Sequence, residues 1–512
     1  MHLKSLAKRN WVEGWLIFAG IVIFITQCVV AKYALSHGGV NHTTLIGAPL
    51  DDTYIHCRYA ENLLSGHGYS FNPGQVVSAD TSPLWVVLIA FGGLFTNHLH
   101  IAAIMLSALA WLLLAPAVYR IARYVFLWDK TFSLMAAIAM LLSPRLLVMN
   151  LSGMETTLAT LLVLIAVELH IRSREMNIIR LREAFVLACG IALRPEFYFL
   201  VVLVLIDWGY CLLKKKGSFR EFSFFLVPIA ISAVLVFSIP YFESGTLLYH
   251  SSIVQGAGFR FPPDFYYILR SYYILFAPME WLSIIVVIQL FRFKFPKVNG
   301  YSVMPIAFML LLPIVQAFVA PQFRHFGRYV FPLLPIALLY LVGIVRANIL
   351  RESGNLNKTF SSSKWTVLGY VALATLYSMP MAVKWTNVYA NSVSNINDQH
   401  IAVVDWVKSN STSSDMIAAD DVGALGYFTK RNLIDLTGLV SPEFYPLQRD
   451  QKLVWSQARK QGANLFIIYR RLNPTFYEYA KDSLELVKDF RVRGELVSSA
   501  DTTLSIYRLK KS

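Results

Sequence analysis

Two adjacent carboxylates stand in the stretch Leu50-Asp51-Asp52-Thr53-Tyr54-Ile55-His56-Cys57-Arg58-Tyr59-Ala60-Glu61-Asn62-Leu63. The apolar segment before this stretch, from Gly14 to about Ala34, is long enough to cross a lipid bilayer. Ionisable side chains at a membrane boundary are costly to desolvate, so they are candidates for function. Asp51 and Asp52 are therefore the first candidates for chemistry in this chain.

The composition is that of a polytopic membrane protein. The chain has 512 residues, of which 56% are hydrophobic and 15% are charged, whereas soluble domains carry about 25% charged residues. The net charge of +15 is explained by Lys and Arg in short cytoplasmic loops, which set membrane topology, so no nucleic-acid partner is expected. The four cysteines show neither metal-ligand spacing nor a disulfide framework.

The charge distribution predicts the topology. Five basic clusters separate the apolar runs, and assigning all five to the cytoplasm gives alternating spans and a cytoplasmic N-terminus. This assignment requires Pro83–Phe95, which is too short to cross the bilayer, to lie at the outer interface. The eleven predicted spans are 14–35, 101–119, 132–149, 156–171, 183–194, 196–213, 222–240, 268–291, 301–320, 330–345 and 366–384.

The predicted organisation is an α-helical transmembrane domain, residues 1–384, followed by a small α/β domain, residues 385–512. Residues 36–100 form the first outer loop with interfacial helices, and the C-terminal domain is expected outside the cytoplasm. Helices are expected at 401–408 and 453–461. Short strands are expected at 416–419, 432–436, 464–469, 484–487 and 503–507.

Asp51 and Asp52 have two interpretations. A carboxylate in a partly dry cleft can take the proton of a hydroxyl during glycosyl transfer, and helical spacing would place Tyr54 and Arg58 on the face of Asp51. In this interpretation Arg58 orients a carboxylate or binds a phosphate. Alternatively, one aspartate caps an interfacial helix that runs to about Leu64. The sequence favours the base, with a slight preference for Asp51, and one aspartate could cap while the other reacts.

Three further groups of polar residues are predicted to face outward and bind substrate. Glu155 opens a span, where it could instead only face the helix dipole. Arg194 and Glu196 flank Pro195 at the membrane boundary, where a turn with a local ion pair is the alternative. His250 lies in the long outer loop 241–267, where a structural role is the simpler interpretation.

The motif Arg324-His325-Phe326-Gly327-Arg328-Tyr329 places two arginines and a histidine at the outer edge of a span. The positive-inside rule disfavours this position, which indicates an anionic ligand such as a lipid phosphate. Contact with anionic lipid headgroups is the alternative. No Gly-rich phosphate loop supports a nucleotide-sugar donor, so a lipid-linked donor fits the predicted topology better.

The order of these motifs resembles a bacterial branch of the GT-C glycosyltransferases that includes terminal β-(1→2) arabinofuranosyltransferases. The similarity runs through Asp51-Asp52-Thr53-Tyr54-Ile55, Gly66-His67-Gly68, Phe71-Asn72-Pro73-Gly74, Thr81-Ser82-Pro83-Leu84-Trp85, Ser152-Gly153-Met154-Glu155-Thr156, Leu193-Arg194-Pro195-Glu196 and Asp421-Val422-Gly423. The family's first loop often reads Glu-Gly where this chain has Ser78-Ala79-Asp80, which affects an expected substrate contact.

The resemblance implies a multi-span GT-C fold in the bacterial inner membrane. It also implies inverting transfer from a polyprenyl-phosphate sugar to an envelope glycan or glycolipid, with Asp51 and Asp52 supplying the base. Two carboxylates can hold a divalent cation but are too few to establish a metal site, so no cofactor is assigned. The alternatives are a transporter or lipid-linked sugar flippase, which the lack of an internal repeat disfavours, and a non-catalytic assembly factor.

Overall fold

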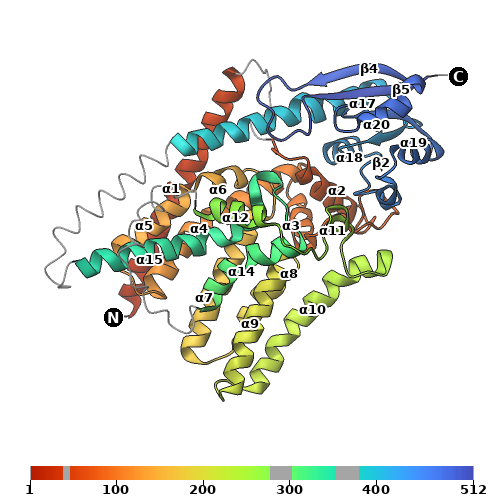
Figure 1. Ribbon diagram of the computed structural model, residues 1–512. Coiled ribbons are helices and arrows are strands. Elements are labelled where there is room, and N and C mark those ends of the chain that lie inside the picture. Colours follow the sequence, from red (N-terminus) through yellow and green to blue (C-terminus); the bar gives the residue numbers. More distant parts are fainter. Residues whose placement is uncertain (1, 38–46, 277–302, 353–379, 511–512) are drawn as a thin grey trace.

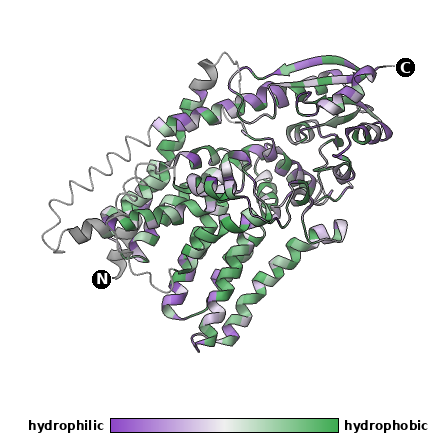
Figure 2. Ribbon diagram, in the orientation of Figure 1, coloured by the Kyte–Doolittle hydropathy of each residue, from purple (hydrophilic) through white to green (hydrophobic). Residues whose placement is uncertain are grey.

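The computed structural model describes residues 2–37, 47–276, 303–352 and 380–510 (Figure 1). In these residues, six helical segments are long and apolar enough to cross a membrane. They are Trp11–Lys32 within α1 (His2–His37), α4 (Leu99–Tyr124), α7 (Thr156–Met176), α9 (Glu196–Leu213), α10 (Phe219–Ser244) and His325–Ile344, which comprises η3 (His325–Leu333) and the start of α15 (Leu334–Glu352). Figure 2 shows these helices as mostly hydrophobic, and the chain is a polytopic α-helical membrane protein.

The predicted span 132–149 is not one helix. The chain forms α5 (Lys130–Leu141) and α6 (Pro144–Met149), with a break at Ser143. Pro144 has no N–H to continue the helix, and a residue before proline is pushed toward extended backbone. Ser143 has φ −62° and ψ 108°, as this rule requires.

Other predicted spans are shorter than expected or extend beyond the described residues. The prediction at 183–194 corresponds to α8 (Leu181–Ile191), an 11-residue helix that packs against α7 and α10. The prediction at 301–320 corresponds to α14 (Val303–Val319). The spans predicted at 268–291 and 366–384 lie partly outside the described residues, which include α12 (Phe265–Phe276).

The first outer loop contains the two helices that were expected to be interfacial. They are α2 (Asp52–Leu64) and α3 (Pro83–Gly93), which packs against α2 and α4. At about 1.5 Å per residue, α3 is roughly half as long as a bilayer core is thick. The buried Trp85 indole donates a hydrogen bond to the Gly153 carbonyl, 3.1 Å away. This contact fixes α3 beside the loop that precedes α7.

All five strands predicted in the C-terminal domain are present. They are β1 (Met416–Ala419), β2 (Leu433–Asp435), β3 (Ala463–Ile468), β4 (Leu484–Arg491) and β5 (Thr503–Leu509), in the sheet order β2-β1-β3-β5-β4. β1 is parallel to β2 and β3, whereas β5 is antiparallel to β3 and β4. The predicted helices are α17 (Ala402–Asn410) and α19 (Gln451–Lys460).

The two faces of this sheet pack against different partners. Ile417 and Ile467 join the core shared with the membrane helices, while Ala418 and Phe466 join a separate core formed with α19 and α20 (Pro474–Ala480). This division follows from the alternation of side chains along a strand. The predicted boundary at residue 385 falls inside a helical segment, 380–396, that continues into η4 (Asn397–Ile401).

The C-terminal domain is joined to residues 36–100, the predicted first outer loop, by hydrogen bonds between side chains and backbone. Asn72 accepts from the Leu433 N–H and donates to the Leu433 carbonyl, at 3.0 and 2.9 Å, at the edge strand β2. The Tyr427 hydroxyl, on α18 (Gly423–Thr429), accepts from the Leu99 N–H at 3.1 Å. Helix α18 packs directly against α2 and lies between α2 and the sheet (Figure 1).

Candidate active site

The amino-terminal end of α2 is fixed by the loop that precedes α7. The Thr53 hydroxyl donates to the Ser152 carbonyl at 2.8 Å. Gly153 lies at φ +72°, and a Cβ there would come within 2.7 Å of the Thr53 methyl carbon. Glycine is therefore required for this contact, both for its backbone conformation and for its size.

Asp51 is held by the C-terminal domain. Its carboxylate accepts hydrogen bonds from the Gly423 and Ala424 N–H groups, at 2.7 and 2.8 Å, and pairs with His400 Nδ1 at 3.0 Å. It therefore satisfies two N–H groups at the start of α18, and it makes no capping bond to α2 itself. Asp51 therefore caps a helix, as the capping interpretation predicted, but that helix is α18 and not α2.

Asp52 is more accessible than Asp51. Its side chain is 34% exposed, and its carboxylate lies 3.2 Å from Arg328 Nη2 and 3.6 Å from His325 Nδ1. Burial would raise the pKa of the Asp52 carboxyl, but the charges of the histidines and arginines around it hold that pKa below its ordinary value. Asp52 is thus an ionised carboxylate that is open on one side.

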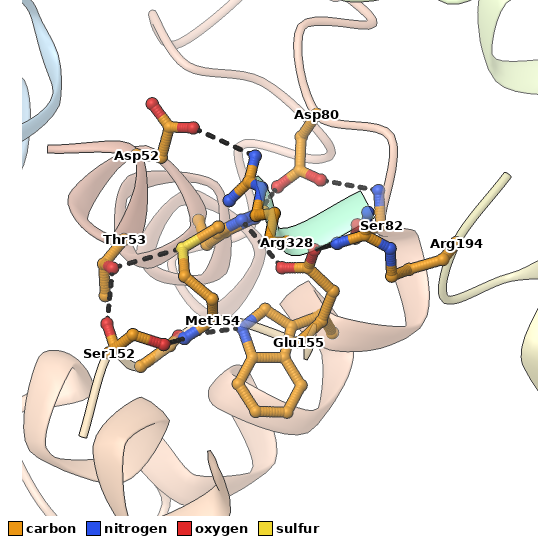
Figure 3. Close-up of polar contacts among 12 residues, drawn as sticks. Asp52, Thr53, Asp80, Ser82, Ser152, Met154, Glu155, Arg194 and Arg328 are labelled. Atoms are coloured by element: carbon orange, nitrogen blue, oxygen red, sulfur yellow. Dashed lines mark hydrogen bonds and ion pairs between the residues drawn. The ribbon is translucent and has the colours of Figure 1, made fainter. Parts of the chain in front are cut away.

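A cavity of about 440 Å³ is lined by Glu155, Arg194, Glu196, Arg328 and Tyr329, so the structure brings five predicted binding residues together. Arg194 is neutralised there, because it contacts Glu155 at 2.5 Å and Glu196 at 2.6 Å. Figure 3 shows this ion pair beside Arg328, whose side chain is directed at Asp52. The remaining wall is mainly apolar and comes from α9 and α14.

Arg328 has unused hydrogen-bonding capacity. Its side chain is 9% exposed and reaches Asp52 through Nη2 alone. Its Nε and Nη1 atoms are buried without a hydrogen-bond partner, and a buried unsatisfied donor costs about 1–3 kcal/mol. These donors are available to an anion in the cavity, whereas the donors of Arg194 are engaged by two carboxylates.

The sequence analysis missed His56, and it named Asp80 only as part of Ser78-Ala79-Asp80, where the resemblance implied a substrate contact. His56 lies one turn after Asp52 on α2, with its Nδ1 2.5 Å from Asp80 and its Nε2 3.5 Å from Glu155. Burial would lower the pKa of His56, but Asp80 and Glu155 raise it to about 10. His56 is therefore a buried cation that links the first loop to the cavity wall. The i, i+4 spacing of Asp52 and His56 could have indicated it.

The other five predicted binding residues do not line the cavity. Tyr54 is buried against Tyr427. Arg58 donates to the Phe71 carbonyl and pairs with Glu61, so it neither orients the aspartates nor reaches the cavity. The remaining three are also outside the cavity lining. His250 contacts the Gly438 carbonyl at 2.6 Å, Arg324 is exposed, and His325 lies 3.6 Å from Asp52.

The described residues contain no group of three or more His, Cys, Asp or Glu side chains that could hold a metal ion. Asp51 and Asp52 also point to different partners, since Asp51 accepts from the α18 backbone and Asp52 pairs with Arg328. The two carboxylates therefore do not form a shared pair of ligands, and no step is assigned to a cation.

Comparisons with known proteins define the fold. A family model described as a domain of unknown function, DUF8728, matches residues 392–507. No curated protein matches the sequence. Among solved structures, ArnT from Cupriavidus metallidurans in the apo state is similar, at 12% identity and a TM-score of 0.57 over 98% of each chain.

Two further structures are similar over most of this chain. ArnT from Cupriavidus metallidurans bound to undecaprenyl phosphate is 11% identical, with a TM-score of 0.55 over 97% of this chain and 98% of that chain. The oligosaccharyltransferase of Archaeoglobus fulgidus tethered to an acceptor peptide is 9% identical, with a TM-score of 0.56 over 90% of this chain and 70% of that chain. The GT-C fold implied by the sequence resemblance is confirmed.

Proposed function

We propose that this protein is a membrane glycosyltransferase that moves a sugar from a polyprenyl-phosphate donor to an envelope glycan or glycolipid on the outer face. One observation carries the proposal. The open carboxylate of Asp52 adjoins a cavity in which the buried Arg328 has two nitrogen atoms without a partner. A base and an unsatisfied cation side by side are what transfer from a phosphate-linked sugar requires.

The shape and chemistry of the cavity match the proposed donor. Arg194 and Arg328 line its polar part, and Phe199, Val202 and Leu312 line its apolar part. A polyprenyl phosphate has the same division between a charged end and a hydrocarbon chain. Its phosphate would take the free donors of Arg328. The bound undecaprenyl phosphate of the similar ArnT structure supports this assignment.

In the proposed reaction, an acceptor hydroxyl attacks the anomeric carbon of the donor sugar. The bond between the acceptor oxygen and that carbon forms, and the bond from that carbon to the phosphate oxygen breaks. The electron pair leaves with polyprenyl phosphate, and the proton of the hydroxyl passes to Asp52. Attack opposite the leaving phosphate inverts the anomeric centre.

Asp52, rather than Asp51, is the proposed base. The sequence slightly favoured Asp51, but the Asp51 side chain is only 14% exposed and accepts three hydrogen bonds. A base needs a lone pair that can reach the incoming proton. The 34% exposed carboxylate of Asp52 is the better candidate.

The test uses the full-length protein in lipid nanodiscs. The donors are a panel of radiolabelled polyprenyl-phosphate pentoses, including arabinofuranose, and hexoses. The acceptor is an envelope extract from a strain that lacks the protein. We expect label in a covalent product with wild type and with Asp405→Asn, an exposed control on α17, and a loss of at least about 100-fold with Asp52→Asn.

Three results would contradict this proposal. Sugar movement across vesicles without a covalent product would favour a transporter or flippase. Donor binding without turnover would favour an assembly factor. Undiminished transfer in Asp51→Asn, Asp52→Asn and the double variant would remove the aspartate base.

A further inference from the structure

The C-terminal sheet presents its carboxyl edge to the candidate active site. Asp420 and Asp421 follow β1, and Tyr469 follows the neighbouring parallel strand β3. In the order β2-β1-β3, the connection from β2 to β3 crosses β1, so the ends of β1 and β3 flank a topological switch point. Open α/β sheets bind ligands in the crevice outside this point.

A continuous set of polar contacts joins this edge to Asp51. His400, on the π-helix η4, contacts Asp51 at 3.0 Å through Nδ1. Through Nε2 it contacts the Tyr469 hydroxyl at 3.1 Å and lies 3.6 Å from Asp421. Asp421 is therefore only one imidazole away from Asp51, which precedes the proposed base Asp52.

The two aspartates after β1 differ in accessibility. Asp420 is 7% exposed and accepts from the Tyr469 N–H and the Asn473 amide, at 2.8 and 3.0 Å. These contacts explain it as a structural residue of the sheet edge. Asp421 has a side chain that is 36% exposed, and its closest charged partner is His400 at 3.6 Å. Asp421 is thus the member of this edge with lone pairs available to a ligand.

We propose that the carboxyl edge of the C-terminal sheet is the acceptor subsite, in which Asp421 binds one hydroxyl of a neutral saccharide while a neighbouring hydroxyl is presented to Asp52. This inference rests on the proposed glycosyl transfer. It assigns a role to the domain of unknown function, which matches residues 392–507.

Two observations support a neutral saccharide as the ligand. Asp51 and Asp421 both face the cation His400, whereas the charge of Asp52 is balanced by Arg328, so carboxylates are in excess around His400 and a phosphate or carboxylate ligand would be repelled there. Hydroxyls, by contrast, donate to carboxylates in short, charge-assisted hydrogen bonds.

Arg328 provides an independent indication of a ligand next to the edge. It is nine-tenths buried, contacts Asp52, lines the cavity, and has two buried nitrogen atoms without a hydrogen-bond partner. The donor phosphate assigned to these atoms would place the reacting sugar near Asp52. The acceptor must then approach Asp52 from the other side, where the C-terminal domain stands.

The test measures transfer by full-length protein in nanodiscs, with the donor that turns over in the assay above and the same envelope extract as acceptor. The variants are Asp421→Asn, Asp421→Glu and the matched control Asp405→Asn. We expect Asp421→Asn to raise the acceptor KM roughly 10- to 100-fold, with donor KM and undecaprenyl phosphate binding unchanged. Asp421→Glu should fall between wild type and Asp421→Asn, and the control should match wild type.

The outcomes separate this inference from the proposed function. Wild-type protein without transfer would defeat both. Normal wild-type transfer with an unchanged acceptor KM in Asp421→Asn would overturn the subsite and leave the transferase standing. If Asp421→Asn weakened donor binding by the same factor as it raised the acceptor KM, Asp421 would have a structural role, and the subsite would also be overturned.

Discussion

Replacing Asp51 by alanine should mainly weaken the attachment of the C-terminal domain to α2, and should affect transfer only through this weaker attachment. The carboxylate makes two hydrogen bonds to the start of α18 and one to His400. Loss of a helix-capping side chain costs about 1 kcal/mol, and a hydrogen bond to a charged group contributes about 1.5–3 kcal/mol. Together these give a loss of roughly 3 kcal/mol, which is about a 100-fold shift in an opening equilibrium.

Hydrogen–deuterium exchange of the full-length protein in nanodiscs measures this opening. We expect the amides of Gly423 and Ala424 to lose about 100-fold in protection in Asp51→Ala, because these two N–H groups lose their acceptor. The amides of β3 should change less, since their partners lie within the sheet. Transfer should be reduced through weaker docking of the acceptor-binding domain.

Asp52→Ala is the matched control for this experiment. It removes a neighbouring carboxylate whose hydrogen bond comes from Arg328, whereas the N–H groups of α18 bind Asp51. Exchange of Gly423 and Ala424 should therefore match wild type while transfer is lost. The reasoning would be refuted by wild-type exchange at Gly423 and Ala424 in Asp51→Ala together with a loss of transfer as large as in Asp52→Ala. That result would make Asp51 the base.

Three further predictions concern the site. Asp52→Asn should lower kcat by about 100-fold or more, because general base catalysis contributes at least that much; an unchanged kcat would contradict it. Arg328→Lys should weaken undecaprenyl phosphate binding by roughly 10-fold or more, since lysine lacks the planar set of donors; flotation with labelled lipid would measure it, and wild-type affinity would argue against a phosphate at Arg328. Burial and the charges of Asp51 and Asp52 raise the pKa of Asp421 to about 6, with His400 opposing them. The acceptor KM should therefore rise as the pH falls through 6, when Asp421 becomes protonated, while kcat holds to about pH 5 because the pKa of Asp52 lies below its ordinary value near 4. A flat acceptor KM between pH 5 and 7 would contradict the role of Asp421.

Local sequence patterns predicted helices and strands well where the length and spacing of apolar runs are clear. The C-terminal strands were predicted because the apolar runs shorten to strand length there. The Pro83–Phe95 run was predicted not to cross the bilayer because the alternation of basic clusters required this and the run is short. The break before Pro144 was missed, although the missing proline N–H is itself a sequence signal.

Several site residues could also be predicted from the sequence. Glu155, Arg194 and Glu196 were selected as charged residues at a membrane boundary, and Arg328 was selected because the positive-inside rule disfavours its position. The structure brings all four to one cavity. The sequence could not show which charges form ion pairs. Arg194 is neutralised by Glu155 and Glu196, whereas Arg328 keeps two unpartnered nitrogen atoms, and this difference appears only in the structure.

The sequence by itself determined that this is a polytopic membrane protein with an α/β C-terminal domain, and it drew attention to the two adjacent aspartates Asp51 and Asp52. Only the tertiary structure decided how the two aspartates differ. Their distinction depends on partners more than 270 residues away, His400 with α18 for Asp51 and Arg328 for Asp52. Adjacent residues on a helix point in different directions, so a pair that looks equivalent in sequence meets two different surfaces once the chain folds.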